Sequence, residues 1–256
     1  MPDLEKELRA RRDGGRKLLI PYLMGGMTDD WAQSLDALVA AGADAVEVGI
    51  PFSDPMMDGP VIQEAGLRAL TRGTVPQEVL DGIARAEAPV PVVVMTYYNI
   101  VFRAGHKRMA RSLAAAGVSG AIIADLPIEE IAPWAAEADA AGVDTVLLVA
   151  PSSPTDRVVR ICARARGFVY AVARMGVTGE RGDLGIDVTK VVERIRRCTD
   201  MPVCVGVGVS TPAQAAEVCE VADGVVVGSA LVRRLLEGEG PDGAAAFVGS
   251  LREAID

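Results

Sequence analysis

The stretch that decides the fold is Val39-Ala-Ala-Gly-Ala-Asp-Ala-Val-Glu-Val-Gly-Ile-Pro51. Ala-rich helical spacing ends at Gly42, and a short apolar run follows at once. A glycine just past a helix adopts the left-handed conformation and turns the chain into the next element. The same Ala-Ala-Gly sequence returns from Ala115 and from Ala140, each time before another apolar run. The sequence therefore predicts a repeating helix–strand unit.

Working outward, apolar runs of strand length occur along the whole chain. They are Leu18–Leu23, Ala45–Ile50, Val92–Thr96, Gly120–Ala124, Thr145–Ala150, Phe168–Val172, Val203–Val207 and Gly224–Val227. The runs are almost continuously apolar, which is typical of parallel strands covered on both faces.

Stretches with helical spacing lie between these runs. They are Trp31–Ala41, Pro76–Ala86, Lys107–Ala116, Glu129–Ala141, Thr155–Arg166, Val188–Thr199, Thr211–Val221 and about 243–254, with an extra leading helix at Asp3–Arg12. Eight strands alternating with helices in 256 residues predict an α/β fold, a (β/α)₈ TIM barrel. No linker divides the chain, so we expect one domain over residues 1–256. The alternative, an open doubly wound sheet, lacks a G-x-G-x-x-G motif opening a helix.

Composition excludes several classes of protein. Half of the residues are hydrophobic, so a disordered chain is excluded. The net charge of −9 argues against nucleic-acid binding, which needs a basic face. The charged start has no apolar signal-peptide core, and no uncharged stretch reaches the roughly 20 residues of a membrane span. We expect a soluble, cytoplasmic protein that does not bind membranes.

Few residues suit metal, triad or Schiff-base chemistry. The four cysteines lack the short spacing of a zinc site and are predicted to be buried free thiols: Cys162, Cys198, Cys204 and Cys219. His106 is the one histidine, is expected at the surface, and has no triad context. The four lysines all fall before strands or in helices, so a Schiff base at a strand end is not expected: Lys6, Lys17, Lys107 and Lys190.

Barrel active sites lie at the C-terminal ends of the strands, which turns attention to Glu47. A carboxylate at the end of an apolar strand loses hydration, so its pKa rises and it can act as a general acid. The alternative is a buried Glu paired for structure. Two connections are long, Pro51–Thr74 and Ala173–Asp187, and are expected to close over the site.

Two further carboxylates follow strand ends. Asp58 is either a turn residue or a charge-stabilising partner of Glu47. Asp125 is either a third site carboxylate or a cap of the next helix. A rival hypothesis combines Glu47, Asp58 and Asp125 into a Mg²⁺ site, since that ion prefers carboxylates.

Glycines at the ends of the last strands point to a phosphate site. Gly206-Val-Gly-Val-Ser210 and Val227-Gly-Ser-Ala230 follow the predicted strands 7 and 8. Barrels commonly bind phosphate there, on backbone amides at a helix start. Gly176-Val-Thr-Gly179 is expected to close on the same phosphate.

Together these segments resemble the tryptophan synthase alpha chain family. The most specific is Glu47-Val-Gly-Ile-Pro-Phe-Ser-Asp-Pro-Met-Met-Asp-Gly-Pro60. Others match in the same order over about residues 18–236: Met95-Thr-Tyr-Tyr-Asn99, Ala124-Asp-Leu-Pro127, Phe168-Val-Tyr170, Gly176-Val-Thr-Gly179, Gly206-Val-Gly-Val-Ser210 and Asp223-Gly-Val-Val-Val-Gly-Ser229.

The resemblance implies a lyase that cleaves indole-3-glycerol phosphate to indole and glyceraldehyde 3-phosphate. It implies that Glu47 protonates indole C3 and then helps to remove the side-chain hydroxyl proton, that Asp58 stabilises the indole N1–H, and that Tyr170 lines the site. The implied substrate contacts are Tyr22, Met95 and Ile122 around the indole, Gly179, Gly208, Gly228 and Ser229 around the phosphate, and Tyr97 as a further substrate-binding residue.

The resemblance also implies a partner, a pyridoxal-phosphate beta chain in an αββα assembly, and no cofactor or metal in this chain. The sequence departs from the usual family pattern at Met24-Gly-Gly-Met27 and Ala173-Arg-Met175. Two alternatives therefore stay open: a stand-alone lyase of a specialised pathway, and a non-catalytic activator of a beta chain. Intact Glu47 and Asp58 speak against the second.

Overall fold

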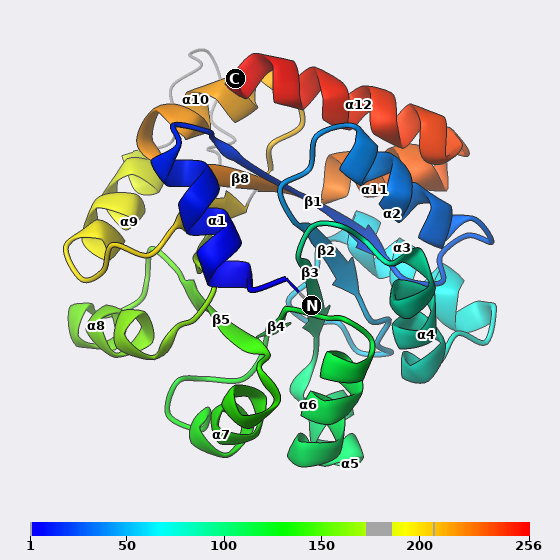
Figure 1. Ribbon diagram of the computed structural model, residues 1–256, viewed down its shortest axis with the longest axis horizontal. Coiled ribbons are helices and arrows are strands. Elements are labelled where there is room, and N and C mark those ends of the chain that lie inside the picture. The colour runs from blue at the N-terminus through cyan, green and yellow to red at the C-terminus, as the bar shows by residue number, and fades with distance from the viewer. Residues whose placement is uncertain (1, 173–185, 207) are drawn as a thin grey trace.

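The strands form a closed parallel barrel (Figure 1) in the computed structural model, which describes residues 2–172, 186–206 and 208–256. Each strand pairs with the next along the chain, and the last pairs with the first. The strands are β1 Leu18–Met24, β2 Val46–Gly49, β3 Val92–Thr96, β4 Gly120–Ile123, β5 Asp144–Val149, β6 Val169–Val172, β7 Val203–Gly206 and β8 Gly224–Val227. The predicted barrel is confirmed, with each strand boundary within one residue of its expected place.

Helices surround the barrel. Those in the described residues are α1 Leu4–Asp13, α2 Trp31–Ala40, α3 Pro60–Thr71, α4 Pro76–Ala86, α5 Tyr98–Ala104, α6 His106–Ala115, α7 Ala132–Ala141, α8 Thr155–Arg164, α9 Ile186–Arg196, α10 Pro212–Val221, α11 Ser229–Leu236 and α12 Gly240–Ile255. None of these helices combines the length and the apolarity that a membrane crossing requires.

The structure corrects the predicted connection after β2 and the predicted start of α7. Half of the connection predicted as a loop over Pro51–Thr74 is helix α3, whose Ile62, Ala65 and Ala69 are buried at helical spacing. Helix α7 begins at Ala132 rather than Glu129. A proline is tolerated only in the first helical turn, so Pro133 prevents an earlier start.

The repeated glycine behaves as its sequence context predicts. Gly42, Gly117 and Gly142 have φ angles of 100°, 80° and 72°. These left-handed conformations follow α2, α6 and α7, and each leads into the next strand. Glycine is the residue that adopts them without a steric penalty.

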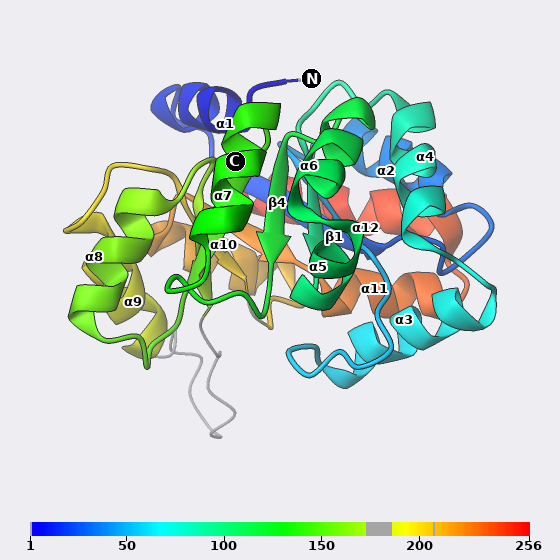
Figure 2. The same cartoon turned by 90° about the horizontal axis from the view of Figure 1, so that it is seen from below.

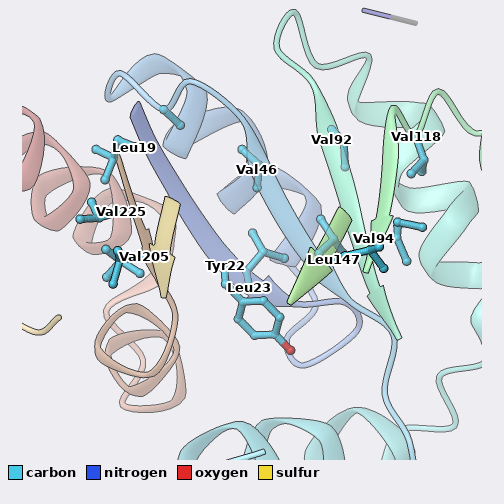
Figure 3. Packing of buried hydrophobic residues seen from close by; sticks show 14 of the residues in the cluster. Leu19, Tyr22, Leu23, Val46, Val92, Val94, Val118, Leu147, Val205 and Val225 are labelled. Atoms are coloured by element: carbon cyan, nitrogen blue, oxygen red, sulfur yellow. The ribbon is translucent and has the colours of Figure 1, made fainter. Parts of the chain in front are cut away.

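Alternate strand residues divide the core into two clusters. One side of each strand packs against the helices, as Leu19, Val46 and Val225 do (Figure 3). The other side fills the barrel interior with a second cluster that includes Ala45, Val93, Ile122, Val146, Phe168, Cys204 and Val226. Barrel-interior layers of this kind make a packed core rather than a pore.

Helix α1 closes the N-terminal end of the barrel. Leu4 and Leu8 are fully buried and belong to the barrel-interior cluster. Figure 2 shows α1 at one end of the molecule and α3 at the opposite end. A functional cavity must therefore open at the α3 end.

A buried carboxylate ties the chain ends to the barrel. Asp44, just before β2, is fully buried and lies 3.0 Å from Arg11, 2.7 Å from Arg16 and 3.0 Å from Arg252. It also accepts the Leu19 N–H at 2.9 Å. Because a buried charge needs partners, this network stabilises α1, β1 and α12 together.

Candidate active site

A cavity of about 910 Å³ opens where the strands end. The floor of the cavity is formed by inward-facing strand residues, which are Tyr22, Glu47, Met95, Leu148 and Tyr170. Successive strand side chains alternate, so Glu47 follows the interior residue Ala45 by two positions. The rim adds Met56, Met57, Asp58, Gly59, Ile62, Ala124, Val172, Gly206, Gly208, Val209, Ser210, Gly228, Ser229, Ala230, Arg233, Arg234 and Glu237, and Val226 also lines the cavity.

Glu47 is the buried carboxyl group of this cavity. Its residue is 1% exposed on β2, between Tyr22 of β1 and Val93 of β3. Burial, and then the nearby charge of Asp58, raise the pKa of Glu47 to about 8. Its Oε2 atom has no hydrogen-bond partner in the described part of the chain. A neutral carboxyl group at pH 7 can therefore donate a proton into the cavity.

Asp58 lies on the loop before α3 and is half-buried. Burial raises its pKa, and a hydrogen bond from the Tyr97 hydroxyl partly offsets that rise. The Tyr97 hydroxyl also accepts the Met57 N–H at 3.1 Å, and its ring stacks on Phe52 at 4.9 Å. Tyr97 therefore holds the Asp58 loop, and it is not among the lining residues of the cavity.

Two tyrosines at the cavity floor each lie over a glycine. The Tyr22 hydroxyl covers Gly49, and the Tyr170 hydroxyl covers Gly206, so closely that a Cβ at either glycine would overlap the ring. The pKa values of both tyrosines lie well above the ordinary value, mainly through burial. Both hydroxyls thus stay neutral. Figure 3 shows the Tyr22 ring projecting from β1.

The segments after β7 and β8, where the sequence predicts a phosphate site, lie together at one side of the cavity. Gly208 has a φ of 64°, and α11 begins at Ser229. The first backbone bond of α11 runs from Val232 N–H to Gly228 C=O at 3.0 Å, so the amides before Val232 have no intrahelical partner. Such amides suit an anion. The Ser210 N–H, by contrast, donates to Gln214 at 2.8 Å.

Of the predicted site residues, eight line this cavity: Glu47, Asp58, Tyr170, Tyr22, Met95, Gly208, Gly228 and Ser229. Gly179, with the segment Gly176–Gly179, lies outside the described residues. Ile122 is fully buried in the barrel interior and is not among the cavity-lining residues. Two residues further on, just after the end of β4, Ala124 lines the cavity instead.

Asp125 does not join the other two carboxylates. Its Oδ1 accepts the Tyr98 N–H at 2.6 Å, so it caps the start of α5, which precedes it, and not the next helix. It does not line the cavity, and the described residues contain no group of three metal-ligating side chains. The geometry therefore does not assemble the three-carboxylate Mg²⁺ site.

The remaining candidate groups lie away from the cavity lining. His106 is half-buried, and its Nε2 atom lies 3.1 Å from the Tyr98 hydroxyl. The four cysteines are free, as predicted, but the prediction that all are buried is wrong for Cys198, which is exposed just after the end of α9.

Several cavity residues were not predicted from the sequence. Leu148 follows the interior residue Val146 by two positions, so strand alternation was a usable signal for it. Arg233 follows Ser229 by four positions on α11, which places both on one helix face. Val172 follows the predicted site residue Tyr170 by two positions on β6, so the same alternation was a usable signal for it, whereas Ile62 carried no comparable signal.

Comparison with known proteins agrees with this geometry. The family model for the tryptophan synthase alpha chain matches residues 8–250. Tryptophan synthase alpha chains from Halorhodospira halophila and Thermobifida fusca are 48% and 46% identical, over 100% and 93% of this chain and 94% and 90% of theirs.

Solved structures give the same result. A crystal structure of tryptophan synthase from M. tuberculosis in a ligand-free form superposes with a TM-score of 0.91 at 38% identity, covering 100% of this chain and 99% of that one. A tryptophan synthase alpha chain from Legionella pneumophila gives 0.90 at 31% identity, over 100% and 98%. With the matching sequence motifs, fold and cavity, these likenesses show that the chain belongs to the tryptophan synthase alpha chain family.

Proposed function

We propose that this protein is a lyase that cleaves indole-3-glycerol phosphate to indole and glyceraldehyde 3-phosphate. The observation that carries the proposal is the buried Glu47, with a pKa of about 8 and an unpartnered Oε2, in one cavity with Asp58 and the α11 amides. A carboxylic acid, a charge stabiliser and an anion site are what this retro-aldol reaction needs.

Glu47 acts first as the acid. At neutral pH its carboxyl group carries a proton, which it gives to C3 of the indole ring. The ring becomes an indolium cation with positive charge at N1. The resulting Glu47 carboxylate then accepts the proton of the side-chain hydroxyl next to C3. The carbon–carbon bond breaks, its electron pair returns to the ring, and the hydroxyl carbon becomes the aldehyde.

Asp58 stabilises the charge that forms at N1. Its half-buried carboxylate accepts the indole N1–H, and the interaction strengthens as the ring becomes cationic. The Tyr97 hydroxyl holds Asp58 in place through the hydrogen bond between them. In this role Tyr97 is a positioning residue and not an indole contact.

The substrate lies across the cavity with its two ends held apart. Tyr22, Met95, Leu148 and Tyr170 supply an apolar floor for the indole. The phosphate lies against the amides at Gly228 and Ser229, where the positive end of the α11 dipole favours an anion.

We further propose a beta chain as partner in an αββα assembly, with pyridoxal phosphate bound by that chain and neither cofactor nor metal bound by this one. Support comes from apolar side chains exposed near the cavity mouth: Met56 and Met57 are 89% and 62% exposed. Exposed methionines suit an adaptable protein interface.

The test is indole release from indole-3-glycerol phosphate by the purified chain, alone and with added beta chain. We expect turnover by the chain alone, a large increase with beta chain because ordered loops exclude water, and no loss on EDTA treatment. Indole release that vanishes with EDTA and returns with Mg²⁺ would overturn the metal-free mechanism. High turnover without binding or stimulation by a beta chain would identify a stand-alone lyase.

A further inference from the structure

Arg233 stands at the rim of the cavity, on the helix whose first turn forms the phosphate end. It follows Ser229 by four residues, and both line the cavity. Residues four apart share a helix face, and helical side chains lean toward the N-terminus of their helix. Arg233 therefore lies one helical turn beyond the amides at Gly228 and Ser229, on the helix face that carries Ser229.

Within the described part of the chain, Arg233 is also a cation without an ion pair. No carboxylate of the described residues lies within ion-pair distance of it, although Glu237 lines the same rim. Its neighbour Arg234 differs: it pairs with Glu239 at 3.0 Å and lies 4.6 Å from the ring centroid of Phe247. The charge of Arg234 is thus already compensated, and that of Arg233 is available to a ligand.

The negative charge of the protein and of the cavity lining makes an unpaired cation important for binding an anion. The chain carries a net charge of −9. Two acidic side chains besides Glu47 line the cavity, Asp58 and Glu237. A phosphate dianion that approaches this cavity meets repulsion, and neutral amides offset it only in part. A single free arginine at the rim would both attract and hold the anion.

We infer that Arg233 is a substrate-binding residue that pairs with the phosphate of the substrate and selects phosphorylated over unphosphorylated indole glycerol. The inference rests on the proposed function and adds to it a charged side chain, where the phosphate site predicted from sequence consists of backbone amides. It places the specificity for the phosphate on the second turn of α11.

The experiment compares Arg233→Gln and Arg233→Lys with the wild type. We expect Arg233→Gln to raise KM for indole-3-glycerol phosphate about three- to tenfold, with kcat within about twofold, because a charged contact made equally in ground and transition states is removed. Arg233→Lys should recover most of the loss. Added salt should raise KM more in the wild type than in Arg233→Gln, because salt screens exposed charges.

Arg85→Gln is the matched control. This substitution removes the same charge from the last turn of α4, where the Arg85 side chain is exposed. Its KM and salt dependence should equal those of the wild type. If Arg233→Gln behaves like Arg85→Gln while the wild type releases indole, the inference is wrong.

A binding measurement separates this outcome from failure of the proposed function. Glycerol 3-phosphate, titrated by calorimetry, carries the phosphate half of the substrate and needs no turnover. Glycerol 3-phosphate should bind the wild type more tightly than it binds Arg233→Gln. It should also bind the wild type more tightly than glycerol does. Equal affinity of the two proteins for glycerol 3-phosphate would overturn the role of Arg233, whatever the fate of the indole assay.

Discussion

The hydroxyl and ring edge of Tyr170 occupy the space that a Cβ at Gly206 would need. The two residues are neighbours across β6 and β7, where Tyr170 pairs with Cys204, and both line the cavity. The glycine on β7 thus fixes where the tyrosine ring on β6 can lie, and with it the floor on which the indole is proposed to rest.

Gly206→Ala should therefore displace the Tyr170 ring into the cavity. We expect kcat/KM for indole-3-glycerol phosphate to fall by at least about tenfold, since small misplacements at a site of this kind reduce rates strongly. The control is Gly249→Ala on α12, where a Cβ meets nothing within 4 Å. Unchanged kcat/KM in Gly206→Ala would show that the Tyr170 position does not matter for turnover.

Tyr97→Phe should change the pH dependence of the reaction. The Tyr97 hydrogen bond lowers the pKa of Asp58, so its loss should raise that pKa and move the acidic limb of the kcat/KM profile to higher pH. Tyr98→Phe is the matched control, because the Tyr98 hydroxyl contacts His106 instead. Identical profiles for the two variants would exclude the positioning role of Tyr97.

The Asp44 network makes a separate prediction about stability. Asp44→Asn leaves three arginines around a neutral side chain, so we expect the free energy of unfolding to fall by about 3–5 kcal/mol. Urea denaturation followed by circular dichroism measures it. Asp200→Asn, which affects an exposed pair with Arg9, should change little. Equal effects of the two substitutions would contradict the structural role of Asp44.

Glu47 should make the protein less stable as the pH rises. Its pKa of about 8 in the folded state exceeds the ordinary value of 4.5, so the folded state holds this proton where the unfolded state has lost it. Its contribution to stability therefore declines between these two pH values. Glu47→Gln lacks the titration, so its stability relative to the wild type should increase from pH 5 to pH 8. A constant difference over that range would contradict the raised pKa.

Much of the fold and part of the site could be predicted from the sequence. The apolar run around Glu47 already placed that carboxyl group near the C-terminal end of a strand, where barrel active sites lie. The Ala-Ala-Gly sequences marked the turns into strands. Helix α3 was missed although Ile62, Ala65 and Ala69 carry helical spacing, because the motif around Asp58 was interpreted as loop throughout.

The positions of the other site residues depend on strand stagger and on contacts between distant segments, which a single sequence does not reveal. Which inward-facing residue reaches the cavity depends on the stagger between strands, so Ile122 lies too deep and Ala124 reaches the cavity. The Tyr97 side chain is directed by a stack on Phe52 and by the loop amide of Met57, contacts between segments 40 or more residues apart. The capping of α5 by Asp125 is also non-local, since the hydrogen bond joins residues 27 positions apart.

The measurement that tests the central claim most directly is indole formation at pH 7 by Glu47→Gln against the wild type, with glycerol 3-phosphate affinity measured on the same samples. If Glu47 is the general acid and base, the rate should fall by at least about 10²–10⁴-fold while glycerol 3-phosphate still binds, because glutamine keeps the shape of the side chain and loses the proton transfer. Near-normal indole formation by Glu47→Gln would contradict the mechanism.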